Sequence, residues 1–292
     1  MASPGPVQSI AVIGAGIMGR GIAHAAAVGG FRTILEDILP ASLRRAQTEI
    51  RAHLDQDVEA GALTREQAEA ALGRMEFASS PEEAARAADL VIEAVPEEME
   101  SKLEIFTLLD KVCKPDTVIA SNTSSLSITE IASVTYRPRK CVGMHFFHPV
   151  PKMKLLEVVR ALETDDESLA IAVAVGRQMG KEVVVIKESP GFITSRLNAL
   201  IGNEAFCLLQ EGVASAADID KAIKLGLNHP TGPFEMVDQV GLDTRLHVLE
   251  YLHKTLGEKY RPAPLLEQYV KAGRLGRKSG RGVYEYPEVT KK

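Results

Sequence analysis

A glycine-rich hexapeptide between a predicted strand and a predicted helix constrains this chain more than any other feature. The sequence GAGIMG occupies residues 14–19, directly after the apolar run 9–13 and overlapping the alanine-rich stretch 18–28. A second apolar run over residues 31–36 completes a βαβ unit of ordinary length. Glycines at this spacing permit a tight turn and a close approach of the backbone to a pyrophosphate, which the amides at a helix N-terminus attract. The pattern therefore predicts a dinucleotide-binding α/β fold.

Asp37 follows the second predicted strand and indicates which dinucleotide is bound. A carboxylate at this place would accept hydrogen bonds from the adenine ribose hydroxyls. Glu36 precedes it and no arginine immediately follows, so negative charge lies where a 2'-phosphate would sit, and NAD is favoured over NADP. The alternative is a glycine-rich turn followed by an acid by chance. The other residues expected to contact the cofactor here are Gly14, Gly16, Ile17, Met18 and Gly19.

The first half of the chain continues the alternation of apolar runs and helical stretches. Helices are predicted over residues 42–60 and 97–112, and another helix is expected to start at Ser80-Pro81. Further strands are predicted at 90–95, 117–121, 142–147, 155–160 and 183–186. Strands this rich in Val, Ile and Leu are typical of a mostly parallel sheet covered by helices on both faces.

Strand-like runs stop after residue 186, and helical patterns replace them. Ser189-Pro190 predicts the start of a helix that runs to about residue 211. More helices are expected at Ser215 and after Pro233, Gly241 and Pro264. We therefore predict a Rossmann-type domain over residues 1–188 and an all-α domain over residues 189–292.

Composition narrows the classes of function. The formal net charge is -5, with 34 Lys+Arg against 39 Asp+Glu, so no overall basic field exists to recruit nucleic acid or anionic lipid. The three cysteines stand far apart, without a histidine at ligand spacing, which disfavours disulfides and a structural zinc. No stretch approaches the ~18 consecutive apolar residues of a membrane span. We expect a cytoplasmic protein that binds no nucleic acid, membrane or metal.

His145 and Glu157 are the candidates for proton transfer. Each is a polar residue inside an apolar, strand-like run. A histidine held by a carboxylate is the arrangement that general acid-base catalysis uses, because histidine exchanges protons near working pH. A lone histidine in such a run is more often a core residue, and spacing alone does not establish that the two side chains touch.

A polar loop over residues 121–126, SNTSSL, follows a predicted strand, at the edge where open α/β sheets present ligand-binding groups. Its plainer interpretation is a connection to a helix capped by Ser127 and Glu130. Five further motifs stand in order along the chain: GAGIMG at 14–19, HFFHPVP at 145–151, LLEVV at 155–159, PGFI at 190–193 and TGPFE at 231–235. Together these motifs resemble the short-chain 3-hydroxyacyl-CoA dehydrogenases, most closely the bacterial 3-hydroxybutyryl-CoA dehydrogenases.

The resemblance implies roles for individual residues. His145 would be the acid-base residue, Glu157 its partner, and Ser124 a hydrogen-bond donor to the C3 oxygen of the substrate that also lies close to the nicotinamide. Glu97, Lys102 and Lys278 match further NAD-contacting positions. From the residues alone, the first two could equally be a pair on an exposed helix face, and Lys278 part of a solvated basic tail.

The chain also departs from the family pattern. Ser195 stands before Arg196 where many relatives have Asn, and His148 replaces an Asn near the nicotinamide ribose. Gln56 and Ala60 occupy places where relatives carry lysines for the CoA phosphates. The possible substitutes are Arg44, Arg45, Arg51 and His53.

The implied function is NAD-dependent interconversion of a (3S)-3-hydroxyacyl-CoA and a 3-oxoacyl-CoA, with 3-hydroxybutyryl-CoA as the expected substrate. Two alternatives remain open: a dehydrogenase of a non-CoA hydroxy acid or sugar acid, and a dinucleotide-binding protein without turnover. The resemblance also implies a homodimer formed through the all-α half.

Overall fold

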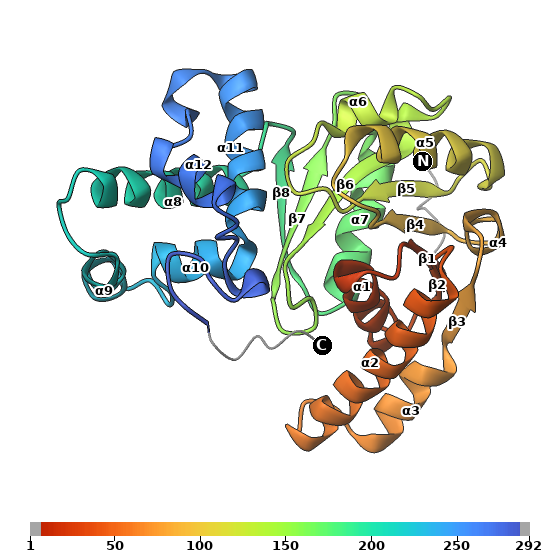
Figure 1. Ribbon diagram of the computed structural model, residues 1–292. Coiled ribbons are helices and arrows are strands. Elements are labelled where there is room, and N and C mark those ends of the chain that lie inside the picture. The colour runs from red at the N-terminus through yellow and green to blue at the C-terminus, as the bar shows by residue number, and fades with distance from the viewer. Residues whose placement is uncertain (1–6, 287–292) are drawn as a thin grey trace. The chain divides into compact units, whose positions relative to one another are not determined.

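The computed structural model describes residues 7–286, and the chain separates into two compact units, one ending at Ser189 and the other beginning at Pro190. The first unit is built on one eight-stranded sheet (Figure 1). Its strands are β1 (Ser9–Ile13), β2 (Arg32–Glu36), β3 (Met75–Ala78), β4 (Leu90–Glu93), β5 (Val118–Ser121), β6 (Cys141–Phe146), β7 (Leu155–Arg160) and β8 (Glu182–Lys187).

The strand order is β3-β2-β1-β4-β5-β6-β7-β8. All neighbours pair in parallel except β6 and β7, which are antiparallel. The carboxyl ends of β1, β2, β4, β5 and β6 therefore meet at one edge of the sheet. The order changes direction at β1, and the loops after β1 and β4 lie on either side of that switch, where open α/β sheets bind their ligands.

Helices cover both faces of this sheet (Figure 1). They are α1 (Ile17–Val28), α2 (Pro40–Glu59), α3 (Arg65–Gly73), α4 (Pro81–Ala85), α5 (Met99–Val112), α6 (Ile128–Ala132) and α7 (Asp166–Gln178), with a short 3-10 helix over Pro138–Lys140. Apolar residues of α1, α2, α3 and α7 pack in one core with Val12, Leu35 and Ile92 of the sheet. Because side chains alternate along a strand, Glu36 and Glu93 project toward the opposite face.

The second unit is helical. It contains α8 (Thr194–Gln210), α9 (Ala216–Gly226), α10 (Pro233–Val240), α11 (Leu242–Leu256) and α12 (Pro264–Lys271), with 3-10 helices at Glu258–Tyr260 and Arg277–Ser279. Phe206, Phe234, Leu249 and Tyr260 are fully buried in its core.

The helix predicted to start at Ser189 and Pro190 is shorter than expected. Gly191 and Phe192 have φ angles of 72° and 52°, in the left-handed region that an α-helix does not include. The helix α8 therefore begins only at Thr194. The prediction of a helix N-terminus at Pro190 is wrong.

Candidate active site

The glycine-rich loop joins β1 to α1 as the sequence predicts. Gly14 has a φ of 98°, and a Cβ there would lie 2.8 Å from the carbonyl oxygen of Ala94. A Cβ at Gly19 would lie 1.7 Å from the carbonyl oxygen of Gly14, whereas a Cβ at Gly16 would meet nothing within 4 Å. Gly16 is also the N-cap of α1, and no side chain caps that end of the helix. The loop thus combines open space with helix-terminal amides, which fits a pyrophosphate group.

Asp37 lies directly beyond β2 and faces the same loop. Its carboxylate accepts hydrogen bonds from the backbone N–H of Ala15 at 3.0 Å and of Leu39 at 2.9 Å. The neighbouring Glu36 is buried, and burial, together with the charge of Asp37, raises its pKa to about 7. Two adjacent carboxyl groups therefore stand at the end of β2, where a ribose is expected and a 2'-phosphate would be repelled.

His145 and Glu157 are register partners across the antiparallel strands β6 and β7. His145 Nδ1 lies 2.7 Å from Glu157 Oε2, and both side chains are buried. The ring of Phe147 lies 4.3 Å from the imidazole, centroid to centroid. The structure thus supplies the contact that sequence spacing could not establish, and it assigns Nδ1 to the carboxylate.

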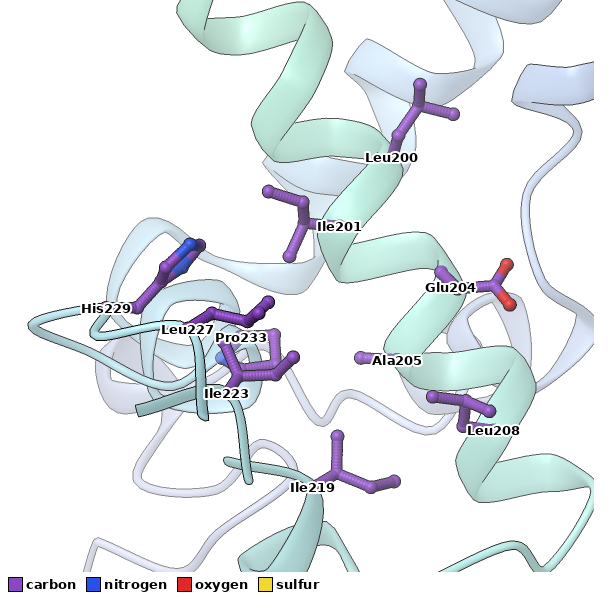
Figure 2. A pocket seen from close by; sticks show the side chains of 10 residues that line it. All are labelled: Leu200, Ile201, Glu204, Ala205, Leu208, Ile219, Ile223, Leu227, His229 and Pro233. Carbon is purple, nitrogen blue, oxygen red and sulfur yellow. The ribbon is translucent and has the colours of Figure 1, made fainter. Parts of the chain in front are cut away.

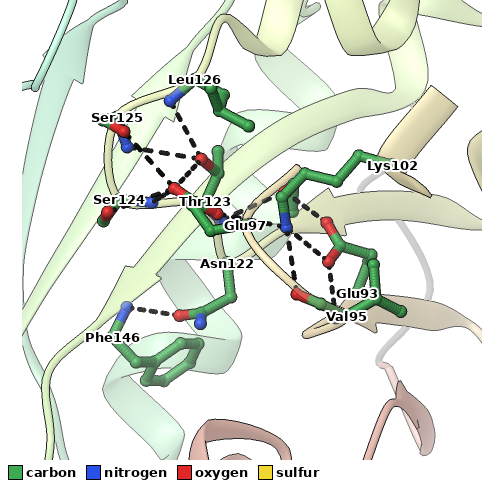
Figure 3. A network of polar contacts seen from close by, with 11 residues as sticks. Glu93, Val95, Glu97, Lys102, Asn122, Thr123, Ser124, Ser125, Leu126 and Phe146 are labelled. Carbon is green, nitrogen blue, oxygen red and sulfur yellow. Dashed lines mark hydrogen bonds and ion pairs between the residues drawn. The ribbon is translucent and has the colours of Figure 1, made fainter. Parts of the chain in front are cut away.

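The loop after β5 is held by Glu97. Glu97 Oε1 accepts from Thr123 Oγ1 at 2.6 Å, from Ser124 N at 2.8 Å and from Ser124 Oγ at 3.2 Å (Figure 3). Lys102 Nζ lies 3.3 Å from Glu97 Oε2. Burial alone would raise the pKa of Glu97, but the Lys102 ammonium and the donors of the loop lower it.

The interpretation of Glu97 and Lys102 as a pair on an exposed helix face is wrong. Lys102 is 1% exposed, and Glu97 precedes α5, which starts at Met99. Asn122 completes the loop, because its Oδ1 accepts a hydrogen bond from the N–H of Phe146, the residue after His145. The Ser124 loop and the histidine strand are therefore directly connected.

The remaining predicted residues lie in other surroundings. His148 is exposed, and its partial burial, together with the nearby Arg20 guanidinium, lowers its pKa. Lys278 belongs to the second unit and forms an ion pair with Asp243 at 2.6 Å. Ser195 lies in the first turn of α8. Their contacts with cofactor or substrate stay predictions.

Two family models match the chain in sequence order. The NAD-binding domain of 3-hydroxyacyl-CoA dehydrogenase matches residues 9–189, and the C-terminal domain of the same enzyme matches residues 191–286. The chain belongs to the 3-hydroxyacyl-CoA dehydrogenase family.

Individual members of the 3-hydroxyacyl-CoA dehydrogenase family agree with this assignment. A probable 3-hydroxybutyryl-CoA dehydrogenase of Bacillus subtilis is 47% identical over 97% of this chain and 99% of its own length. The 3-hydroxybutyryl-CoA dehydrogenase of Bradyrhizobium diazoefficiens is 43% identical over 96% of each chain. The crystal structure of (S)-3-hydroxybutyryl-CoA dehydrogenase from Ralstonia eutropha superimposes with a TM-score of 0.92, at 43% identity, over 96% of this chain and 99% of that one. The predicted family, the Rossmann-type fold, the NAD cofactor and the oxidoreductase class are confirmed.

One buried acid of the site was not singled out from the sequence. Glu93 ends β4, is 0% exposed and contacts Lys102. The sequence contains a signal for it, because Glu93 is an acid inside the apolar run 90–95. Glu157 stands in an apolar run in the same way.

The described residues contain neither a metal-binding cluster nor a membrane-spanning helix. Between residues 7 and 286 there is no group of three or more His, Cys, Asp or Glu side chains that could hold a metal ion. Over the same range, no helix is both long and apolar enough to cross a bilayer.

Proposed function

We propose that this chain is an NAD-dependent oxidoreductase that interconverts (3S)-3-hydroxybutyryl-CoA, or a similar short (3S)-3-hydroxyacyl-CoA, and the matching 3-oxoacyl-CoA. The observation that carries the proposal is the buried His145–Glu157 pair on the same sheet as the glycine loop. His145 stands near the carboxyl end of β6, and the glycine loop follows the carboxyl end of β1. An acid-base group and a dinucleotide site thus share one edge of the sheet.

The glycine loop and Asp37 would bind the cofactor, and His145 would transfer the proton. Gly14, Gly16 and Gly19 would hold the pyrophosphate and Asp37 the adenine ribose. When bound, NAD supplies the hydride acceptor and NADH the hydride donor. In the oxidation direction, His145 Nε2 takes the proton of the substrate hydroxyl, because Nδ1 is occupied by Glu157.

Glu157 and Ser124 assist this proton transfer. The Glu157 carboxylate stabilises the imidazolium that forms when His145 takes the proton. In the structure the Ser124 hydroxyl donates to Glu97 Oε1 at 3.2 Å. When substrate binds, this single proton would turn to the C3 oxygen of the ketone form, while the Ser124 N–H keeps its bond to Glu97. In the reduction direction His145 returns the proton to the C3 oxygen.

A substrate panel tests the proposed function. Acyl-CoA substrates of increasing chain length, each assayed with NADH and with NADPH, should give the highest kcat/KM with a short 3-oxoacyl-CoA and NADH. A dinucleotide-binding protein without turnover would oxidise neither cofactor with any substrate. A dehydrogenase of free hydroxy acids would prefer acids that lack CoA.

Cofactor choice depends on Asp37 in this account. Replacing Asp37 with alanine removes the acceptor for the ribose hydroxyls and a negative charge that repels a 2'-phosphate. We expect Asp37→Ala to lower kcat/KM for NADH by about tenfold, corresponding to about 1.4 kcal/mol, and to narrow the gap between NADH and NADPH. Steady-state kinetics with both cofactors measures this. A wild-type preference for NADPH would remove Asp37 as the selecting residue.

Ser195 is proposed to be an adjustable part of the substrate site. A serine offers one rotating hydroxyl where many relatives place an amide with two donors and a longer reach. We expect Ser195→Ala to lower kcat/KM for the acyl-CoA while NADH affinity stays nearly unchanged, and Ser195→Asn to be tolerated. If Ser195 is only a residue of the first helical turn, both substitutions will change the Tm and leave the kinetics unaltered.

The homodimer is proposed to form through α8 of the second unit. Leu197 and Ile201 lie four residues apart on α8, and Ile193, the N-cap residue of that helix, precedes Leu197 by another four. Their exposed fractions are 57%, 38% and 45%. Ile201 also lines an apolar recess with Ile219 and Leu227, among other residues (Figure 2). Exposed apolar surface of this kind marks interaction sites.

Light scattering tests the proposed dimer. The wild type should have twice the chain mass, and Ile201→Glu should give the mass of one chain. Leu162→Glu is the control, because Leu162 is 80% exposed and lies in the first unit. A monomeric wild type would exclude the proposed dimer.

The CoA moiety would have to bind without the family lysines. Gln56 lies on α2 and Ala60 just beyond its end, and both are exposed. Of the substitutes considered, Arg45 pairs with Glu49 at 2.7 Å, whereas Arg44 and Arg51 are exposed on the same helix. We assign the CoA phosphates to Arg44 and Arg51, a role that charge reversal at either residue would test through KM for the acyl-CoA.

A further inference from the structure

Glu93 is a buried charge at the centre of the sheet, and every oxygen of its carboxylate has a partner. It ends β4, is 0% exposed and lies between β1 and β5. Its Oε1 accepts from the N–H of Val95 and from Lys102 Nζ, both at 2.7 Å. Its Oε2 accepts from Ser121 Oγ at 2.6 Å. A carboxylate this deep in a protein needs such partners, because burial disfavours the charged form.

One branch of contacts leads from Glu93 to Ser124 through two charged side chains (Figure 3). Lys102 Nζ lies between the carboxylates, 2.7 Å from Glu93 Oε1 and 3.3 Å from Glu97 Oε2. The other oxygen of Glu97 then accepts from Thr123 Oγ1 and from the N–H and hydroxyl of Ser124. Lys102 therefore fixes the carboxylate that fixes Ser124.

A second branch reaches the same loop from its first residue. The Ser121 hydroxyl, which donates to Glu93, accepts a hydrogen bond from the N–H of Thr123 at 3.1 Å. The backbone carbonyl of Glu93 accepts from the N–H of Asn122 at 2.9 Å. The Asn122 side chain then accepts from the N–H of Phe146. Glu93 thus holds the start of the loop, and Asn122 connects it to the strand of His145.

The charge pattern explains why the carboxylate matters beyond its shape. Burial raises the pKa of Glu93, although Lys102 and Ser121 act in the opposite direction. The three charges alternate in sign, with the buried ammonium shared between two acids. If Glu93 became neutral, Lys102 would have only Glu97 as a counter-charge. The Lys102 ammonium would then attract the Glu97 carboxylate more strongly and draw it away from Thr123 and Ser124.

We propose that Glu93 is a positioning residue that sets the place of the Ser124 hydroxyl through Lys102 and Glu97 and through Ser121. It touches neither substrate nor cofactor in this account. The inference rests on the proposed function, because it assigns the Ser124 hydroxyl to the C3 oxygen of the substrate. Small displacements of such a group have large effects, since misplacement by about 1 Å can cost a rate on the order of 10²-fold.

A double-mutant cycle between Glu93 and Ser124 tests the proposal, with kcat for reduction of acetoacetyl-CoA by NADH as the readout. Glu93→Gln keeps the shape of the side chain and removes its charge. We expect it to lower kcat by at least about tenfold in the wild-type background and by less than about twofold in the Ser124→Ala background, because residues that act through one group are not additive. An equal loss in both backgrounds would overturn the proposal.

Asp110→Asn is the matched control for a purely structural effect. Asp110 is also a buried acid with a cationic partner. It lies on α5, near the end of the helix that is remote from the Ser124 loop, and its carboxylate pairs with Arg137 at 2.8 Å. It should lower the Tm as Glu93→Gln does and leave kcat within about twofold of wild type. A kcat loss in Asp110→Asn that matches that of Glu93→Gln would also overturn the proposal, because kcat would then follow stability alone.

A milder variant keeps the test decisive if Glu93→Gln does not fold. Ser121→Ala removes only the hydroxyl contacts of the second branch, those of Ser121 with Glu93 and with the N–H of Thr123. We expect a kcat loss of about threefold or more that again disappears in the Ser124→Ala background. A loss of equal size in both backgrounds would contradict the inference. An inactive wild type would instead contradict the proposed function, so the two failures are distinguishable.

Discussion

Replacing His145 with glutamine should leave a folded protein that has lost most of its activity. We expect kcat to fall by roughly 10²- to 10⁴-fold, the range for a positioned acid-base group. Glutamine can still reach Glu157, so the strands β6 and β7 keep their pairing. The glycine loop and Asp37 are untouched, and NADH affinity should therefore stay close to that of the wild type.

Glu157→Gln completes this test. Without the carboxylate 2.7 Å from Nδ1, the imidazolium loses its counter-charge, and kcat should fall, though less than in His145→Gln. Steady-state rates with circular dichroism as the folding control measure both variants. Near-wild-type turnover in folded His145→Gln would move the acid-base role to another residue.

Alanine at Gly19 should lower the Tm, whereas alanine at Gly16 should leave the Tm unchanged. A Cβ at Gly16 meets no atom within 4 Å, so Gly16→Ala should keep the wild-type Tm. A Cβ at Gly19 would lie 1.7 Å from the Gly14 carbonyl oxygen, so Gly19→Ala must displace the loop and lower the Tm.

Both alanines should weaken NADH binding, for different reasons. At Gly16 the methyl group occupies the space that the pyrophosphate needs. We expect the Kd for NADH to rise at least tenfold, which corresponds to about 1.4 kcal/mol of binding free energy. Titration of each variant with NADH, followed by fluorescence, gives the Kd. If Gly16→Ala bound NADH with wild-type affinity, the open space at this residue would not be the cofactor site.

Much of the fold could be predicted because local signals and tertiary structure agree. The strand at Ser9–Ile13 was predicted to the residue, and Ser80 and Ser215 cap α4 and α9 as their sequence patterns indicate. Strands buried on both faces have a strong apolar signal. The sequence therefore predicts the parallel sheet and the change to an all-α half.

The strand β3, which the sequence analysis does not predict, has a weak local signal. The strand β3 is an edge strand of four residues, Met75–Ala78, and three of them are not buried, so its apolar pattern is faint. The prediction of a helix N-terminus at Pro190 is wrong for another reason. The Ser-Pro pattern predicts a helix from Pro190, but it does not indicate that Phe192 takes a left-handed φ of 52°, which interrupts a helix there.

At the site, too, the sequence indicates single residues but not the contacts between them. The sequence identifies Asp37, His145 and Glu157 as individual candidates, because each is a polar residue at the end of, or inside, an apolar run. It does not show that Lys102 is buried between Glu93 and Glu97, since that contact requires β4 and α5 to pack together. Networks that join several elements emerge only from the folded chain.

The most direct measurement is the rate of NADH oxidation by the wild-type protein after addition of acetoacetyl-CoA, compared with the rate after addition of free acetoacetate. We predict rapid oxidation with acetoacetyl-CoA, little with the free acid, and loss of the rapid reaction in His145→Gln. No oxidation with acetoacetyl-CoA, or equal rates with the two substrates, would contradict the assignment of this chain as a 3-hydroxyacyl-CoA dehydrogenase that uses the His145–Glu157 pair.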